Sequence, residues 1–342
     1  MKKYLLPKTG NFYKANLHSH STLSDGNLTP SEMKELYKSH GYSVLAYTDH
    51  DIFIPHHELT DESFLALSGF EAAFNENNRF PGRNNDKTCH LCFIAGSSDM
   101  DVQPCWNPRY AYVGNAKEHH NEIKFDENTF LFERDYSPEG INQMIKIGRD
   151  AGFFVTYNHP TWSLEDYNNY SKYENLNAME ILNYAIEVSG YPSYVPSIYD
   201  DMLRSGKKIF AVAADDNHNV FSYGDPHSDA CGGYIIIKAD KLKYENITNA
   251  LFAGNFYASS GPEIYDLYIE DNKIYVSCSE AVMITLNKDR RRPSMSVVAN
   301  NGKTVNSASF PFENDDVYIR ITIKDSQGRF ANTNAYFIED LG

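Results

Sequence analysis

The residues best suited to chemistry near the start of this 342-residue chain are two histidines and an aspartate. His18 and His20 stand two positions apart, and Asp25-Gly26 follows closely. Side chains on a strand alternate in direction, so both imidazoles would point to the same side. An Asp-Gly turn can fold the Asp25 carboxylate back toward them. Two imidazoles and a carboxylate aimed at one point form a donor set for a divalent metal ion.

Further metal-competent side chains recur where short apolar stretches end. Residues 43–48 form such a stretch and are followed by His50, and residues 153–157 are followed by His159. Polar residues at equivalent ends of several strands indicate one shared site. The same position is taken by Glu71, Asp216 and His218, and His90 opens another apolar stretch.

The apolar stretches alternate with helical patterns up to about residue 261. The clearest helix start is 29–32, with Thr29 as N-cap, proline at the first helical position and a capping-box glutamate. Alternating strands and helices predict a parallel sheet, and this many units indicate a closed barrel. In such barrels the chemistry lies at the carboxyl ends of the strands. A polar, aromatic stretch at 97–135 interrupts the pattern and is predicted to be a long inserted loop.

The pattern changes at about Pro262, where alternating strands without intervening helices begin. We therefore predict two domains, an α/β barrel over 1–261 and a small antiparallel β-sandwich over 262–342. The second domain carries no site constellation, and we expect a structural or interaction role for it. The strands predicted there are 264–269, 273–278, 282–286, 317–323 and 335–338.

Charge and composition narrow the range of partners. The net charge of −15 repels polyphosphate backbones, so duplex nucleic acid is not an expected partner. No apolar run approaches the length of a transmembrane helix, and the charged start lacks the apolar core of a signal peptide. The five cysteines show no disulfide-framework spacing, and Cys89-x-x-Cys92 has no second pair to complete a zinc site. We expect a reduced cytoplasmic protein without a membrane partner.

Taken in order along the chain, these motifs resemble those of the PHP family, the polymerase and histidinol phosphatase superfamily of metal-dependent phosphoesterases. The resemblance covers roughly residues 14–260 and implies a distorted seven-stranded (β/α) barrel. The motifs that carry it are His18-x-His20 with Ser24-Asp25-Gly26, Thr48-Asp49-His50, Gly69-Phe70-Glu71, His90, Asn158-His159-Pro160 and Asp216-Asn217-His218.

The resemblance also implies a site for two to three divalent metal ions. One ion would be held by His18, His20, Glu71 and Asp216, and Glu71 would bridge to a second ion at His90 and His159. Asp25, His50 and His218 would hold the third, with Asp25 standing where many family members carry a histidine. Imidazole and carboxylate donors without thiolate suit Zn, Mn or Fe. Asp49 and Asp215 adjoin these positions, and we interpret them as orienting groups.

Neighbouring cations lower the pKa of a bridging water and neutralise phosphate oxygens, so an acidic protein can still hydrolyse an anionic substrate. Besides the bridging Glu71, two side chains are catalytic candidates. Arg83, with Arg79 in the same loop, could clamp a phosphate, the alternative being a solvated surface position. His227 could protonate the leaving group, the alternative being a polar surface residue.

These observations predict a metal-dependent phosphoesterase acting on a small phosphomonoester or a nucleotide-like phosphate ester. An exonuclease on oligonucleotides could use the same site, although the basic stripes that would favour it are absent from the sequence. An amidohydrolase-type enzyme could cleave an amide or ester with the same water. A non-catalytic binding module, in which the β-sandwich does the work, is the fourth possibility.

Overall fold

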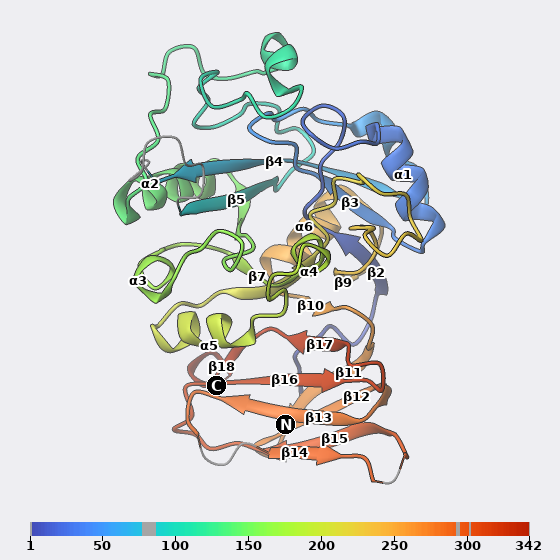
Figure 1. Cartoon of the computed structure of the whole chain (residues 1–342). Helices are drawn as coiled ribbons and strands as arrows, with labels where there is room; N and C mark the ends of the chain where they lie inside the picture. The colour runs from blue at the N-terminus through green and yellow to red at the C-terminus, as the bar shows by residue number, and fades with distance from the viewer. Residues whose placement is uncertain (1, 77–86, 292–294, 301, 342) are drawn as a thin grey trace.

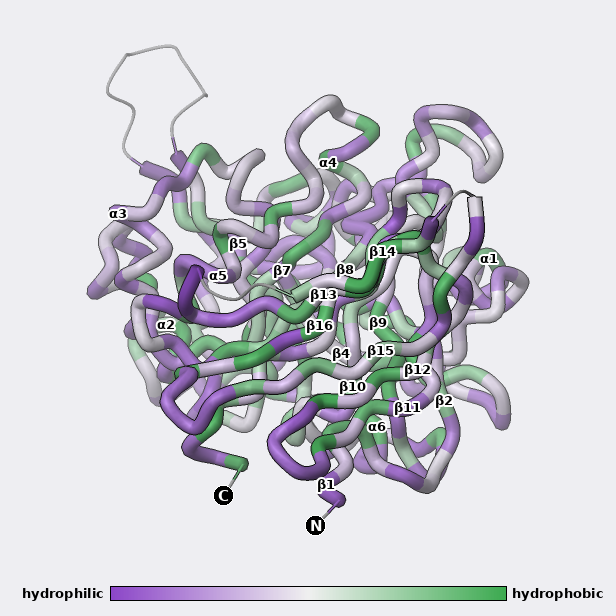
Figure 2. The backbone as a smooth tube through the Cα atoms, turned by 90° about the horizontal axis from the view of Figure 1, so that it is seen from below, coloured by the Kyte–Doolittle hydropathy of each residue, from purple (hydrophilic) through white to green (hydrophobic). Residues whose placement is uncertain are grey.

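The computed structural model describes residues 2–76, 87–291, 295–300 and 302–341. It is a mixed α/β structure with one large mixed sheet and a smaller antiparallel sheet (Figure 1). The strands numbered from β11 onward gather at one end of the molecule, where both termini also lie. Figure 2 shows apolar segments along the central strands and hydrophilic turns toward the rim.

The strands that precede the candidate site follow one another along the large sheet. In this order they are β2 (Asn11–Asn16), β3 (Val44–Tyr47), β4 (Leu65–Asn75), β5 (Thr88–Ala95), β6 (Phe153–Tyr157), β7 (Ala178–Asn183) and β8 (Phe210–Ala214). An isolated parallel bridge between Ser19 and Asn217 links the segment after β2 to the segment after β8. The two ends of this path are therefore joined through the backbone.

The prediction of a parallel sheet up to about residue 261 is wrong at β5, and also at β9 (Tyr234–Ala239) and β10 (Phe256–Ser259), because β9 pairs antiparallel with both β2 and β10. Strands β2, β3 and β4 pair in parallel, as do β6, β7 and β8, but β5 runs antiparallel to both β4 and β6. The sequence between β4 and β5 holds no helical pattern. Strands that follow one another without a crossover helix pair antiparallel.

The remaining strands extend the large sheet and form the smaller one. On the side of β2 away from β3, the large sheet continues through β9 (Tyr234–Ala239), β10 (Phe256–Ser259), β17 (Phe330–Thr333), β16 (Tyr318–Lys324), β13 (Met283–Lys288) and β14 (Met295–Val298). The short strand β18 (Tyr336–Phe337) also pairs with β16. The smaller sheet has the order β1 (Lys3–Tyr4), β11 (Ile264–Glu270), β12 (Lys273–Ala281) and β15 (Val305–Pro311). The five strands predicted after Pro262 are confirmed as β11, β12, β13, β16 and β18, whereas β1, β14, β15 and β17 were not predicted.

Helices cover the strands, and their starts follow the sequence signals. Helix α1 (Pro30–Ser39) begins with the expected capping box, in which the Thr29 side chain accepts from the Glu32 N–H and the Glu32 carboxylate accepts from the Thr29 N–H. No helix among the described residues is long and apolar enough to cross a membrane. The others are α2 (Pro138–Asp150), α3 (Tyr167–Tyr170), α4 (Tyr184–Val188), α5 (Pro196–Arg204) and α6 (Tyr244–Phe252), with 3₁₀ turns η1 (His57–Leu59), η2 (Ala116–Glu122) and η3 (Ile338–Asp340).

The stretch 97–135 is largely irregular, as predicted, but it is well packed. Trp106, Ala116 and Ile123 form a small apolar cluster with Ile52 from the segment after β3. The Gln103 side chain accepts from the Phe53 N–H and donates to the Asp51 carbonyl. The stretch is thereby fixed against the chain that follows His50.

The region after residue 262 is packed against the rest of the protein. Tyr318, Ala335 and Phe337 belong to the larger apolar core, together with side chains of β6, β7 and β8. The Arg320 guanidinium, almost fully buried, donates from Nε and Nη2 to the two oxygens of Asp200 on α5, at 2.8 and 2.6 Å. Paired guanidinium–carboxylate bonds of this kind are geometrically specific.

Replacing Arg320 by Met should lower the free energy of unfolding by about 3 kcal/mol, because it leaves the largely buried carboxylate of Asp200 without its charged partner. Arg204→Met is the matched control, since Arg204 pairs with Asp201 on the same helix in solvent and should cost less than about 1 kcal/mol. Urea denaturation measures both. An equal loss of unfolding free energy in the two variants would show that the buried pair stabilises the protein no more than the exposed pair does.

Candidate metal centre

The structure brings together all nine side chains that were predicted as metal ligands. They come from segments distributed over the whole path from β2 to β8, and most of them are buried. Two placements differ from the prediction, because Glu71 and His90 lie inside β4 and β5 rather than at strand ends. The nine are His18, His20, Asp25, His50, Glu71, His90, His159, Asp216 and His218.

One group of donor atoms surrounds the Nε2 atom of His18. Glu71 Oε1 and Asp216 Oδ1 each lie 3.1 Å from it, and His20 Nε2 lies at the same distance. Asp216 Oδ1 is also 3.0 Å from His20 Nε2. Two imidazoles and two carboxylates thus converge on one small volume.

A second group shares the same Glu71 oxygen. Oε1 of Glu71 lies 3.2 Å from His90 Nδ1 and 3.3 Å from His159 Nε2. The Asn158 side-chain amide also donates to Oε1, at 2.8 Å. Glu71 therefore faces imidazoles of both groups from one buried carboxylate.

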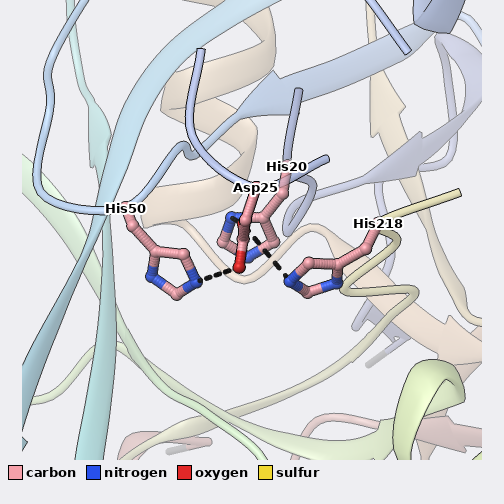
Figure 3. Close-up of side chains that lie close together, drawn as sticks. All are labelled: His20, Asp25, His50 and His218. Atoms are coloured by element: carbon pink, nitrogen blue, oxygen red, sulfur yellow. Dashed lines mark ion pairs between the residues drawn. The ribbon is translucent and has the colours of Figure 1, made fainter. Parts of the chain in front are cut away.

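The third group is drawn in Figure 3, where the Asp25 carboxylate lies among the rings of His20, His50 and His218. Its oxygens are 3.9 Å from His20 Nδ1, 3.7 Å from His50 Nε2 and 3.5 Å from His218 Nε2. Because His20 presents Nε2 to Asp216 and Nδ1 to Asp25, its ring lies between this group and the first.

Unpartnered atoms show that the donor set fits divalent cations. Among the described residues, His20 Nδ1, His50 Nδ1, His90 Nδ1 and Glu71 Oε2 are buried without a hydrogen bond of acceptable geometry. Buried polar atoms of folded proteins are normally satisfied, and a coordinated ion would satisfy these. The 3.1 Å approach of two imidazole nitrogens, His18 Nε2 and His20 Nε2, is also what shared coordination would produce.

The surroundings set the protonation of these donors. Burial, together with His50 and His218, lowers the pKa of His20 to about 4, so the ring is neutral at pH 7 and one of its nitrogens has a lone pair available. Burial opposes ionisation of Glu71, yet the facing imidazoles of His18 and His90 hold its pKa well below the usual range. The Cys92 thiol adjoins this group, but burial raises its pKa to about 11, which makes it a poor ligand at neutral pH.

Glu180 of β7 is a functional candidate that the sequence reasoning missed. Its Oε1 lies 2.8 Å from His18 Nδ1, and its Oε2 accepts from the His159 N–H and the Asn183 amide, each at 2.8 Å. A carboxylate behind a ligating histidine fixes the ring and its tautomer. The available signal was a single acidic residue within the apolar run of β7.

The two aspartates interpreted as orienting groups hold the backbone around the ligands. Asp49 accepts from the N–H and hydroxyl groups of both Ser21 and Ser24, which fixes the turn before Asp25. Asp215 accepts from the Tyr37 hydroxyl and from the backbone N–H groups of residues 231–233. Neither carboxylate belongs to a cluster of potential ligands.

The catalytic candidates outside the ligand set are placed differently. Arg79 and Arg83 lie outside the described residues. His227 lines the cavity above the ligands, but its side chain is exposed, and its Nδ1 lies 3.2 Å from Asp225 Oδ1.

Arg134 of the stretch 97–135 lines the cavity and was also missed by the sequence reasoning. The Arg134 side chain is only 5% exposed. It donates from Nη1 to the Ala73 carbonyl at 2.7 Å and pairs through Nη2 with Asp51, which follows His50. Its Nε has no hydrogen-bond partner among the described residues. The cavity that it lines has a volume of about 580 Å³.

No protein-family model and no curated protein matches this chain. Solved structures are similar at low identity. A two-domain protein from Bacteroides vulgatus, described as containing a predicted PHP-like metal-dependent phosphoesterase, is 13% identical over 94% of each chain, with a TM-score of 0.45.

Two shorter structures are also similar. A candidate metal-dependent phosphoesterase from Bifidobacterium adolescentis is 15% identical, with 66% of this chain and 94% of that chain covered and a TM-score of 0.36. An amidohydrolase from Chromobacterium violaceum, with bound sulfate and no metal, is 16% identical, with 60% and 87% covered and a TM-score of 0.32.

Glu180→Gln should weaken metal binding by about 10- to 100-fold, because an amide holds the His18 ring less firmly than a carboxylate does. Metal affinity is measured by competition with a chromophoric chelator, and circular dichroism checks the fold. Glu187→Gln is the matched control, since Glu187 lies exposed on α4. Unchanged affinity in Glu180→Gln would show that the carboxylate does not position a ligand.

Proposed function

We propose that this protein is a metal-dependent phosphoesterase that hydrolyses small phosphomonoesters or nucleotide-like phosphate esters. The observation that carries the proposal is the buried Glu71 carboxylate, whose Oε1 faces His18, His90 and His159 within 3.3 Å. One carboxylate oxygen faced by several imidazole donors is an arrangement suited to bridging two ions. Phosphoryl transfer needs little beyond such positioning and charge.

We assign two to three divalent ions, Zn, Mn or Fe, to the three donor groups. The first group would hold one ion and the second group another, with Glu71 common to both, and the Asp25 group would hold the third. Such ions supply positive charge against phosphoryl oxygens and Lewis acidity toward water. The mixed imidazole and carboxylate donors support this choice of metals.

The chain's own part is to hold the donors in place and to set their protonation. The low pKa of His20 keeps its ring neutral at physiological pH. Glu180 occupies Nδ1 of His18, so that Nε2 points toward Glu71 and Asp216. We retain His227 as the proposed proton donor to the leaving group because it lines the same cavity, and Arg83 as the proposed phosphate clamp.

We further propose that β2 to β8 form the distorted seven-stranded barrel and that residues 262–342 form a small antiparallel β-sandwich. The bridge between Ser19 and Asn217 supports barrel closure. All nine proposed ligands precede residue 262, and every strand pairing described after it is antiparallel. The second domain would then support the site without contributing to it.

The proposed partner is a small phosphorylated substrate, rather than duplex nucleic acid or a membrane. The net charge of −15 supports the exclusion of duplex nucleic acid. We also propose a cytoplasmic location. All five cysteines lie among the described residues and are free, which is typical of a reducing compartment.

Glu71→Gln should remove at least one ion and reduce phosphomonoester hydrolysis by more than about 100-fold, because a bridging charge is lost. Elemental analysis and hydrolysis of p-nitrophenyl phosphate in added Mn measure the two effects. Glu62→Gln, an exposed change, should leave both at the wild-type level. Wild-type metal content and turnover in Glu71→Gln would refute the assignment.

The amidohydrolase and exonuclease alternatives are separated by a substrate panel with the metal-loaded protein. We expect p-nitrophenyl phosphate to be hydrolysed, and p-nitrophenyl acetate and a single-stranded oligonucleotide to be turned over at least about 100-fold more slowly. Chelation should abolish the phosphatase activity, and Mn should restore it. Metal-dependent hydrolysis of p-nitrophenyl acetate alone would favour the amidohydrolase hypothesis. Processive release of nucleotides from the oligonucleotide would favour the exonuclease hypothesis.

A further inference from the structure

One wall of the cavity above the candidate metal centre is apolar, and its side chains have no part in the proposed metal chemistry. Tyr112, Trp162, Val220 and Phe221 are all at least two-fifths exposed, and all of them line this one cavity. They come from three segments of the chain, since Val220 and Phe221 are neighbours in the sequence. Exposed apolar side chains gathered around a concave site mark a binding surface.

Trp162 is fixed directly beside two proposed ligands. It follows His159 by three residues, and its ring lies edge-on to His90 at 5.3 Å and to His159 at 5.1 Å between centroids. The turn is closed by a hydrogen bond from the Ser163 N–H to the His159 carbonyl, at 3.2 Å. Its position is therefore set together with that of the ligand.

A buried set of hydrogen bonds to the Glu165 carboxylate, here called the Glu165 clasp, holds the chain just after Trp162. The Glu165 carboxylate accepts from the hydroxyls of Tyr136 at 2.7 Å and Tyr157 at 2.6 Å, and from that of Tyr173. Three phenols on one carboxylate leave this segment little freedom. The indole is thus a pre-organised wall.

Phe221 has a similar relation to a second proposed ligand, since it follows His218 by three residues. The Asp229 carboxylate anchors this loop by accepting from the N–H groups of His218 and Asn219, at 2.7 and 3.0 Å. The ring of Phe221 lies 5.2 Å from that of His227. Aromatic surface therefore adjoins both the ligands and the proposed proton donor.

The size of the cavity indicates that a phosphate group alone would not fill it. Its volume of about 580 Å³ falls in the range of roughly 300–1,000 Å³ that is typical of small-molecule sites. A phosphate at the ligands would leave most of this space to the rest of the substrate. Aromatic walls gain most from flat apolar groups that stack or meet them edge to face.

We infer that Trp162 and its apolar neighbours form an aryl subsite, so that the substrate is a phosphate monoester whose alcohol carries a flat apolar ring. This inference rests on the proposed phosphoesterase function and narrows its substrate class. Trp162 is the specificity-determining residue, because it touches both the cavity and the ligand histidines. Sugar and glycerol phosphates would not use this wall.

Binding of non-hydrolysable phosphonates to the zinc-loaded full-length protein tests the subsite. Phenylphosphonate and methylphosphonate share a head group and differ in the ring, and calorimetry gives both dissociation constants. We expect phenylphosphonate to bind about tenfold tighter. Tryptophan fluorescence gives a second readout, since Trp106 is buried in a separate cluster and Trp162 is the other tryptophan of the chain.

Trp162→Ala should bring the ratio of the two dissociation constants close to one, and the metal content of the variant is measured alongside. Trp162→Phe keeps an aromatic wall and should retain much of the preference. Tyr167→Ala removes an exposed aromatic side chain that does not line the cavity, and should change neither constant. Equal binding of the two phosphonates, or a preference that survives Trp162→Ala, would overturn the subsite.

Carboxylates separate this inference from the phosphoesterase proposal. If neither phosphonate binds but benzoate binds more tightly than acetate in a Trp162-dependent way, the apolar wall is supported and the phosphate chemistry is refuted. If methylphosphonate binds with metal and phenylphosphonate gains nothing, the phosphoesterase proposal stands and the aryl subsite is refuted. Binding of none of the four refutes both.

Discussion

The structure around the site depends on one costly feature, the burial of the Glu71 carboxylate. A buried unpaired carboxylate is strongly unfavourable, so its neighbours must compensate for the lost water. The imidazoles of His18, His90 and His159 and the amide of Asn158 do so from different segments of the chain. The fold must hold these groups against their mutual crowding, and the proposed ions would relieve it.

Strand pairing places the groups that meet at Glu71. In the antiparallel ladder Glu71 stands opposite Cys92, and His90 stands opposite Ala73, two residues further along β4. Diagonal neighbours on one face of a ladder are within reach of long side chains, which brings His90 to the carboxylate. A parallel β5 would have a different register and would not place His90 diagonally opposite Glu71.

Buried carboxylates behind the ligands hold these contacts in a fixed arrangement. Glu180 ties His18 to the backbone of His159, and Asp49 ties the turn before Asp25 to the end of β3. The Glu165 clasp does the same for the segment that carries Trp162. Ligands and cavity wall are therefore each positioned by buried carboxylates whose hydrogen bonds are satisfied.

The sequence by itself determined the nine candidate donors, the cap of α1 and most strands, because alternation and capping are local properties of the chain. Tertiary structure alone decided the direction of β5, the role of Glu180, and the meeting of Arg134 with Asp51 and of Arg320 with Asp200. Those partners are far apart in the sequence. Which distant polar groups share a buried volume depends on how the strands pair, and no local pattern records it.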